Sequence, residues 1–289
     1  MRRGAAVVLL LSAIAVRCSS PPPPPPAERY PIKGQLLAVQ LDTGQVLLKH
    51  DAVPGYMDGM TMPFTVADRA SMRDRRPGDL VTATLVIEPG RTRLEELTFT
   101  GTAPLPDTGA ERPAAPVPML VAGDPAPALA LTSQFGQPVS IADWAGSAGV
   151  ITFIYTRCPL PDFCPLMDAR FKEIQAAARG DAALKDRVRL LSVSFDPGFD
   201  TPEVLAAHAV RAGAEDHWVF ATAPAAVVDR FAAAFGVNVI READGSITHN
   251  LRTAVIGPDG RVAAIHSGND WTAEAVLADL RRALAQTAP

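Results

Sequence analysis

The sequence lacks a long basic run, a hydrophobic stretch of membrane-spanning length and the motifs of several enzyme classes. Its 289 residues carry a formal net charge of −4, so the charge pattern gives no reason to expect a nucleic-acid partner. The apolar stretch Ala5–Val16 is shorter than the ~18 residues that a spanning helix needs. No phosphate-binding loop, catalytic serine or carboxylate pair is evident. Cysteine is also scarce, with three in the chain, and two of them flank one short loop.

Residues 1–18 have the pattern of an export signal. Arg2 and Arg3 provide a charged start, and the apolar stretch that follows fits the hydrophobic region of a signal peptide. Cys18 and the Pro-rich tether over residues 19–29 then resemble a bacterial lipoprotein signal, in which the cysteine is lipidated and the prolines form a stiff spacer.

Two other outcomes stay open at this end of the chain. The residue before a lipidated cysteine is normally small, whereas Arg17 stands there, and Ala13-Ile14-Ala15 offers the small-x-small site of an ordinary signal peptidase. An uncleaved anchor is the third outcome. All three place the body of the chain in an oxidising compartment. We therefore expect a periplasmic protein, held at the membrane by a lipid or a signal anchor.

Proline divides the rest of the chain, with 27 residues against an average of roughly 5%. Residues 30–102 alternate short apolar runs with turn signals, which predicts a small all-β, OB-like barrel. Residues 103–119 form a Pro-rich linker without apolar periodicity. Residues 120–289 alternate predicted strands and helices and finish with a hairpin and a helix, which is the order of a thioredoxin-like α/β domain.

Periodicity assigns individual elements within the second domain. Val150–Tyr155 and Val188–Phe195 are predicted to be buried strands, and apolar residues recur at helical spacing up to Ala178, before Gly180. Thr201 suits the N-cap of a further helix. Other predicted elements are a strand at Trp218–Ala221, a helix at Pro224–Phe235, a hairpin of Thr253–Ile256 with Val262–His266, and a last helix at Ala273–Ala285.

Two cysteines bracket the loop after the first predicted strand. The segment Cys158-Pro159-Leu160-Pro161-Asp162-Phe163-Cys164-Pro165 follows it directly, and Pro165 suits the first turn of a helix that begins at Cys164. The free N–H groups at a helix start should lower the pKa of the Cys164 thiol. Thiolate is both a nucleophile and a soft metal ligand, so the pair predicts thiol–disulfide exchange or a copper or zinc site. A structural disulfide is the simpler alternative.

His249 favours the metal site. It lies in a predicted loop just before the strand Thr253–Ile256, where thioredoxins usually place a cis-proline beside the cysteine loop. Two thiolates and an imidazole form a trigonal set suited to Cu(I), and a more tetragonal one with Cu(II). For a lone histidine, an ordinary polar loop position is the alternative.

These segments resemble the SCO/SenC family, thioredoxin-fold copper proteins implicated in assembling the CuA site of cytochrome oxidase. The matching stretches are Phe153–Pro159, Cys164-Pro165, Ser192–Pro197, Asp200–Glu203 and His249. The resemblance implies that Cys158, Cys164 and His249 are the copper ligands. It also places Asp196 where the family has an acid near the site, with a turn-forming role as the equal alternative. The family usually has three residues between its cysteines, and the five in this chain leave copper affinity and redox potential open.

A methionine cluster lies in the first predicted domain. Met57, Met60 and Met62 fall within six residues, shortly after His50. Thioether is a soft ligand that favours Cu(I), and alternate positions of a strand share a face. Methionines that merely fill the core of a small barrel are the alternative.

The segment from Lys49 to Phe64 resembles the periplasmic CusF-like copper/silver-binding family, a five-stranded barrel that uses one His and two Met under a capping Trp. The resemblance implies His50, Met60 and Met62 as ligands. Met57 falls where the Trp would be, and would add a ligand or shield the ion.

Together these features predict an exported copper chaperone that carries a His/Met site and a Cys/Cys/His site. The expected acceptor is the apo copper subunit of cytochrome oxidase or another copper protein, and a thiol reductase is expected to keep the cysteines reduced. Two alternatives stay open. One is a thiol–disulfide reductase that uses Cys158 and Cys164 as a redox pair on a copper-site precursor, and the other is periplasmic copper buffering for metal tolerance.

Overall fold

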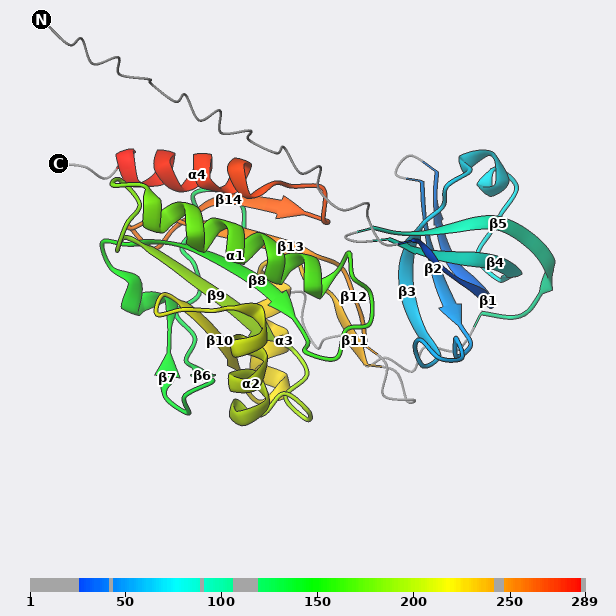
Figure 1. The fold of residues 1–289 in the computed structure, drawn as a ribbon, viewed down its shortest axis with the longest axis horizontal. Coiled ribbons are helices and arrows are strands. Elements are labelled where there is room, and N and C mark those ends of the chain that lie inside the picture. The colour runs from blue at the N-terminus through cyan, green and yellow to red at the C-terminus, as the bar shows by residue number, and fades with distance from the viewer. Residues whose placement is uncertain (1–25, 42–43, 89–90, 106–118, 242–246, 287–289) are drawn as a thin grey trace, which may run out of the picture.

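The structure is a computed structural model, and it describes residues 26–41, 44–88, 91–105, 119–241 and 247–286. This part of the chain forms two domains that lie side by side (Figure 1). No helix among these residues is long and apolar enough to cross a membrane.

The first domain is one antiparallel sheet with the strand order β3-β2-β1-β4-β5. Its elements are β1 (Glu28–Gln40), β2 (Gln45–His50), β3 (Met60–Thr65), the 3-10 turn η1 (Arg69–Met72), β4 (Asp79–Glu88) and β5 (Arg91–Thr102). Leu36, Leu48 and Leu85 are fully buried on its inner face. The sheet curls until Val66, just after β3, forms a single parallel bridge with Leu94 of β5. The predicted all-β domain is confirmed, although the described strands do not pair into a closed barrel.

The second domain is built on a seven-stranded sheet with the order β14-β13-β8-β9-β10-β6-β7. These strands are β6 (Leu131–Ser133), β7 (Pro138–Val139), β8 (Ala148–Ile154), β9 (Val188–Ser194), β10 (Trp218–Thr222), β13 (Arg252–Ile256) and β14 (Val262–Ser267). A separate pair consists of β11 (Val239–Arg241) and β12 (Ile247–His249). The helical elements are η2 (Ile141–Trp144), α1 (Cys164–Gly180), α2 (Pro202–Ala212), α3 (Ala225–Ala234) and α4 (Ala273–Gln286).

Helices cover both faces of the seven-stranded sheet (Figure 1). On one face, Trp218 of β10 packs 5.7 Å from Phe171 of α1, measured between ring centroids. On the other face, Phe153 of β8 packs 5.9 Å from Phe231 of α3. The parallel strands β8, β9 and β10 are joined through α1 and α2, which confirms the predicted thioredoxin-like α/β fold. Because α1 follows central strand β8, the cysteine loop lies at the carboxyl end of that strand.

Local signals define the ends of the helices as predicted. Helix α1 begins at Cys164 with Pro165 in its first turn and ends at Gly180. The Thr201 hydroxyl caps α2 by accepting the Val204 N–H at 3.4 Å. The predicted loop around His249 is wrong, because this residue ends strand β12, which pairs with β11. All three residues of β12 are buried. The segment therefore lacks the alternation of apolar and polar residues that predicts a half-buried strand from sequence.

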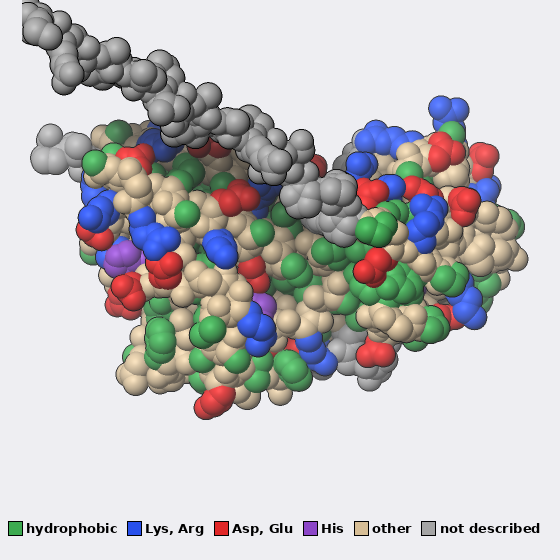
Figure 2. All heavy atoms as spheres, in the orientation of Figure 1, with side chains coloured by type: hydrophobic (Ala, Val, Ile, Leu, Met, Phe, Trp, Pro, Cys, Tyr) green, Lys and Arg blue, Asp and Glu red, His purple; other side chains and the backbone are tan. Residues whose placement is uncertain are grey.

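The two domains meet along strands β3 and β12, which come from distant parts of the chain (Figure 1). In the space-filling view, the surfaces of the domains touch and hydrophobic side chains lie on both sides of the seam (Figure 2). The Thr248 hydroxyl of β12 donates a hydrogen bond to the Thr61 carbonyl of β3. This contact brings the predicted methionine site and the predicted cysteine site to the same interface.

Candidate functional site

The two cysteines lie together at the start of α1. Cys158 is half-buried in the loop after β8, and Cys164 is buried as the first residue of the helix. Neither forms a disulfide, and the Cys164 thiol lies near enough to help lower the pKa of the Cys158 thiol. A reduced, paired dithiol of this kind can bind a soft metal or exchange with a disulfide.

The two thiols differ in acidity. Burial by itself would raise the pKa of the Cys158 thiol. The net pKa is nevertheless below the ordinary value, because the thiolate is stabilised by the Cys164 thiol, by the backbone of Cys164 and Leu160, and by the Tyr155 hydroxyl. For Cys164, burial and the neighbouring Cys158 raise the pKa well above the ordinary value. The prediction that the helix start would make Cys164 the acidic thiol is therefore wrong. Cys158 is the thiol that deprotonates first. A second thiolate at Cys164, beside the first in a buried site, is unfavourable.

His249 lies behind the cysteine loop among aromatic rings. Its ring centroid is 4.6 Å from that of Phe195 and 5.7 Å from that of Tyr155. The Nδ1 atom lies 3.1 Å from the Asn250 carbonyl oxygen, and the buried Nε2 atom has no hydrogen-bond partner among the described residues. Burial lowers the pKa of His249 to about 4, so the imidazole is neutral at pH 7, which is the form that binds metal.

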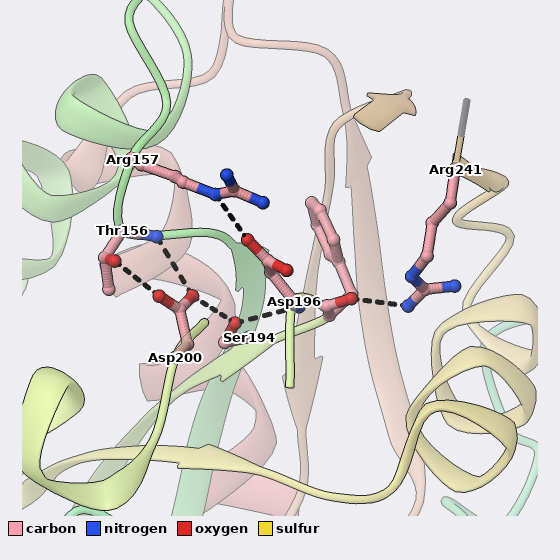
Figure 3. Close-up of polar contacts among 7 residues, drawn as sticks. Thr156, Arg157, Ser194, Asp196, Asp200 and Arg241 are labelled. Atoms are coloured by element: carbon pink, nitrogen blue, oxygen red, sulfur yellow. Dashed lines mark hydrogen bonds and ion pairs between the residues drawn. The ribbon is translucent and has the colours of Figure 1, made fainter. Parts of the chain in front are cut away.

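A buried carboxylate holds the turn that carries Cys158. Asp200 accepts the Thr156 N–H at 3.1 Å and the Ser194 hydroxyl at 2.5 Å, and the Thr156 hydroxyl also donates to it (Figure 3). Asp200 is completely buried, so these charge-assisted bonds are made in a low-dielectric environment. They fix the backbone two residues before Cys158.

An ion pair and a hydrogen bond to the backbone hold the neighbouring loop. Asp196 accepts from Arg157 Nε at 2.8 Å, and Arg241 donates to the Phe195 carbonyl at 2.5 Å (Figure 3). Asp196 also accepts the Asp200 N–H at 2.8 Å through its own carbonyl. Asp196 therefore shapes a turn and is paired with Arg157, the residue next to Cys158. Its role toward copper stays a prediction.

The methionine cluster lies on the paired strands β2 and β3. His50 stands directly opposite Met60, and Met62 stands opposite Leu48. Opposed residues and alternate residues of paired strands share a face, so His50, Met60 and Met62 lie on one face, with His50 and Met62 buried. Met57 is also buried and forms a bridge with Val53 at the turn before β3.

The predicted Cys/Cys/His ligands are not arranged as a finished metal site. Among the described residues, no group of three or more His, Cys, Asp or Glu side chains is placed to hold a metal ion. The structure brings Cys158 and Cys164 together, with His249 packed against the Tyr155 ring that borders them. The donor chemistry nevertheless suits a soft ion, since it combines an acidic thiol, a second thiol and a neutral imidazole.

Comparison with known proteins places this geometry in a family. Residues 123–285, which include both cysteines and His249, match the sequence profile of SCO1/SenC. The chain belongs to the SCO1/SenC family. Its first domain, over residues 29–98, matches the profile described as copper binding periplasmic protein CusF, so an SCO1/SenC domain follows a CusF-like domain in one chain.

Individual relatives resemble parts of the chain. A protein of Stutzerimonas stutzeri that is named for copper binding is 28% identical over 140 residues, which are 46% of this chain and 65% of that relative. The chain therefore matches just under two thirds of the relative's length. A SCO1/SenC family lipoprotein from Bacillus anthracis str. Ames is 28% identical, with a TM-score of 0.50 over 57% of this chain and 99% of that one. BsSco, described as a member of the Sco family of cytochrome c oxidase assembly proteins, is 26% identical, with a TM-score of 0.49 over 56% of this chain and 96% of that one.

Sequence reasoning missed several residues around this SCO1/SenC site. Tyr155 and Asp200 support the cysteine turn, and Tyr56, Asp162 and Thr248 contact the other domain. The sequence did contain a signal for Asp200. This acid stands directly before the Thr201-Pro202 start of a predicted helix, close to the end of the preceding predicted strand. The inter-domain contacts had no sequence signal, because they join positions 70 to 187 residues apart.

Proposed function

We propose that this protein is an exported copper chaperone with two copper sites. Cys158, Cys164 and His249 are the proposed ligands in the SCO1/SenC domain, and His50, Met60 and Met62 those in the CusF-like domain, with Met57 as a further ligand or a shield. The observation that carries the proposal is the pair of free thiols at the start of α1, near a buried, neutral imidazole that packs against Tyr155. Thiol and thioether donors favour Cu(I) over harder ions.

The proposed acceptor is the apo copper subunit of cytochrome c oxidase, in line with what the SCO/SenC resemblance implies. The contact between β3 and β12 supports a relay in which the His/Met site captures copper and passes it to the cysteine site, since a short separation within one chain raises the effective concentration of the donor. Export to the periplasm and a lipid or signal anchor at the membrane belong to the same proposal, as does a thiol reductase that maintains the dithiol.

The stoichiometry of Cu(I) tests the two-site proposal. The reduced full chain would compete with a chromophoric chelator for Cu(I), beside Cys158→Ser/Cys164→Ser and Met60→Leu/Met62→Leu variants. We expect two bound ions in the parent chain and one in each variant. One ion in the parent chain, with no change in the cysteine variant, would mean that the SCO1/SenC domain binds no copper and would refute the proposal.

Thiol–disulfide exchange is the second candidate, and the unequal acidity of the two thiols favours it. An acidic Cys158 is suited to attack a disulfide, and Cys164 is suited to resolve the mixed disulfide that results. His249→Ala separates the two functions. Copper transport predicts that this variant loses tight Cu(I) binding, whereas a reductase would keep most of its dithiol exchange rate, measured with a model disulfide.

A further inference from the structure

The loop between the two cysteines is a contact surface for the first domain. The Tyr56 hydroxyl donates to the Pro159 carbonyl at 2.6 Å, and the Thr92 N–H donates to Asp162 Oδ2 at 2.8 Å. On the other side of the loop, the Asn269 side-chain amide donates to the Asp162 carbonyl at 2.8 Å. Asp162 is therefore held between the two domains, two residues before Cys164.

A second contact lies beside His249. The hydrogen bond from Thr248 to the Thr61 carbonyl joins β12 to β3. The Thr61 side chain is buried, and it lies on the opposite face of β3 from Met60 and Met62. The first domain thus contacts both segments that carry the proposed SCO1/SenC ligands.

The fit between the domains is incomplete. A cleft of about 440 Å³ remains between them, lined in part by Thr92, Asp162 and His249. Asp162 Oδ1, Thr92 Oγ1 and His249 Nε2 are buried with no hydrogen-bond partner among the described residues. Leaving Asp162 Oδ1 and Thr92 Oγ1 unpaired opposes their burial between the domains, so the docked arrangement carries a cost that separation of the domains would relieve.

We infer that the first domain is a separable cover for the cysteine site. When docked, it closes over the inter-cysteine loop and the edge of β12. When it separates, the loop and Cys158 become available to a protein acceptor. The functional role of docking and separation rests on the proposed copper transfer. The docking itself requires no metal.

The test removes two inter-domain hydroxyls without altering the cysteine loop. The experiment uses the 289-residue chain in a Cys18→Ser background, reduced and metal-free, so that Cys158 and Cys164 supply all of its thiols. Tyr56→Phe/Thr248→Val deletes one hydroxyl donor from each domain. The matched control is Tyr30→Phe/Thr84→Val, which deletes two hydroxyl donors that bond within the first domain, to Glu28 and Glu96.

Two measurements report on docking. The first is the rate at which a bulky polyethylene-glycol maleimide modifies the chain, and the second is the radius of gyration from small-angle X-ray scattering. Loss of two hydrogen bonds should raise the maleimide rate about tenfold and increase the radius of gyration, while the control should match the parent chain. Tyr56→Phe alone, which removes the donor to the Pro159 carbonyl, should act in the same direction and serves as a second variant if the first folds poorly by circular dichroism.

Equal maleimide rates in the parent, test and control chains would overturn the inference, as would a parent chain whose scattering already matches separated domains. If the rate difference holds but the parent chain binds no Cu(I), the docking stands and the proposed copper function fails. The two ideas are therefore distinguished by the same set of proteins.

Discussion

Replacing Asp200 with alanine should destabilise the SCO1/SenC domain strongly. Its carboxylate is completely buried and accepts hydrogen bonds from the Thr156 N–H, the Thr156 hydroxyl and the Ser194 hydroxyl. A hydrogen bond to a charged group contributes about 1.5–3 kcal/mol, and the three donors left unpaired would recover part of that by shifting or by admitting water. We therefore expect a loss of about 3–5 kcal/mol in the free energy of unfolding.

The tryptophans make this measurement specific to one domain. All three of them, Trp144, Trp218 and Trp271, lie in the SCO1/SenC domain, so urea unfolding followed by tryptophan fluorescence reports on that domain alone. Asp270→Ala removes an exposed carboxylate of the same domain and should change stability by less than about 0.5 kcal/mol. A loss below about 1 kcal/mol in Asp200→Ala would refute the idea that this carboxylate holds the cysteine turn.

Three further predictions concern the proposed ligands. The pKa of His249 is about 4 when folded and 6.5 ordinarily, so the unfolded state binds more protons between these values and stability falls as the pH drops. We expect a loss of about 2.5 kcal/mol from pH 7 to pH 4.5, and a smaller one in His249→Phe, by urea unfolding at each pH. Iodoacetamide at pH 7 should modify Cys158 before Cys164, because the pKa of Cys158 is lowered and that of Cys164 is raised; peptide mass spectrometry that finds the reverse order would contradict this. Met62→Leu preserves the volume of a buried side chain, so it should cost under about 1.5 kcal/mol yet weaken Cu(I) binding to the CusF-like domain in a chelator competition. Unchanged affinity would mean that Met62 only packs.

Much of the fold was predictable because its signals are local. The apolar run at Val150–Tyr155 supplies most of the buried central strand β8, which ends at Ile154, Pro165 lies in the first turn of α1, and Thr201 caps α2. Each depends on residues within a few positions of one another, and the preferences of proline, threonine and buried β-branched residues act over that range. The same is true of the candidate ligands, whose residue types and spacing depend only on the chain.

The errors arose where burial or a distant partner decides the outcome. His249 was expected in a loop, but the packing of both domains around β12 buries every residue of that strand, which removes the alternation that marks a strand in sequence. The pKa of Cys164 was expected to fall because it begins a helix. Burial and the neighbouring Cys158 raise it instead, and neither effect is visible in the local sequence.

The sequence by itself therefore determined the two fold classes, the order of their elements and the set of soft ligands, since these follow from local preferences and from the chemistry of the side chains. Tertiary structure alone decided which thiol is acidic, which carboxylate supports the cysteine turn and that the two domains meet. The contacts of Tyr56 with Pro159 and of Thr61 with Thr248 join positions 103 and 187 residues apart. Such pairs form only when the folded surfaces of both domains come together, and no residue near either end of the pair specifies its partner.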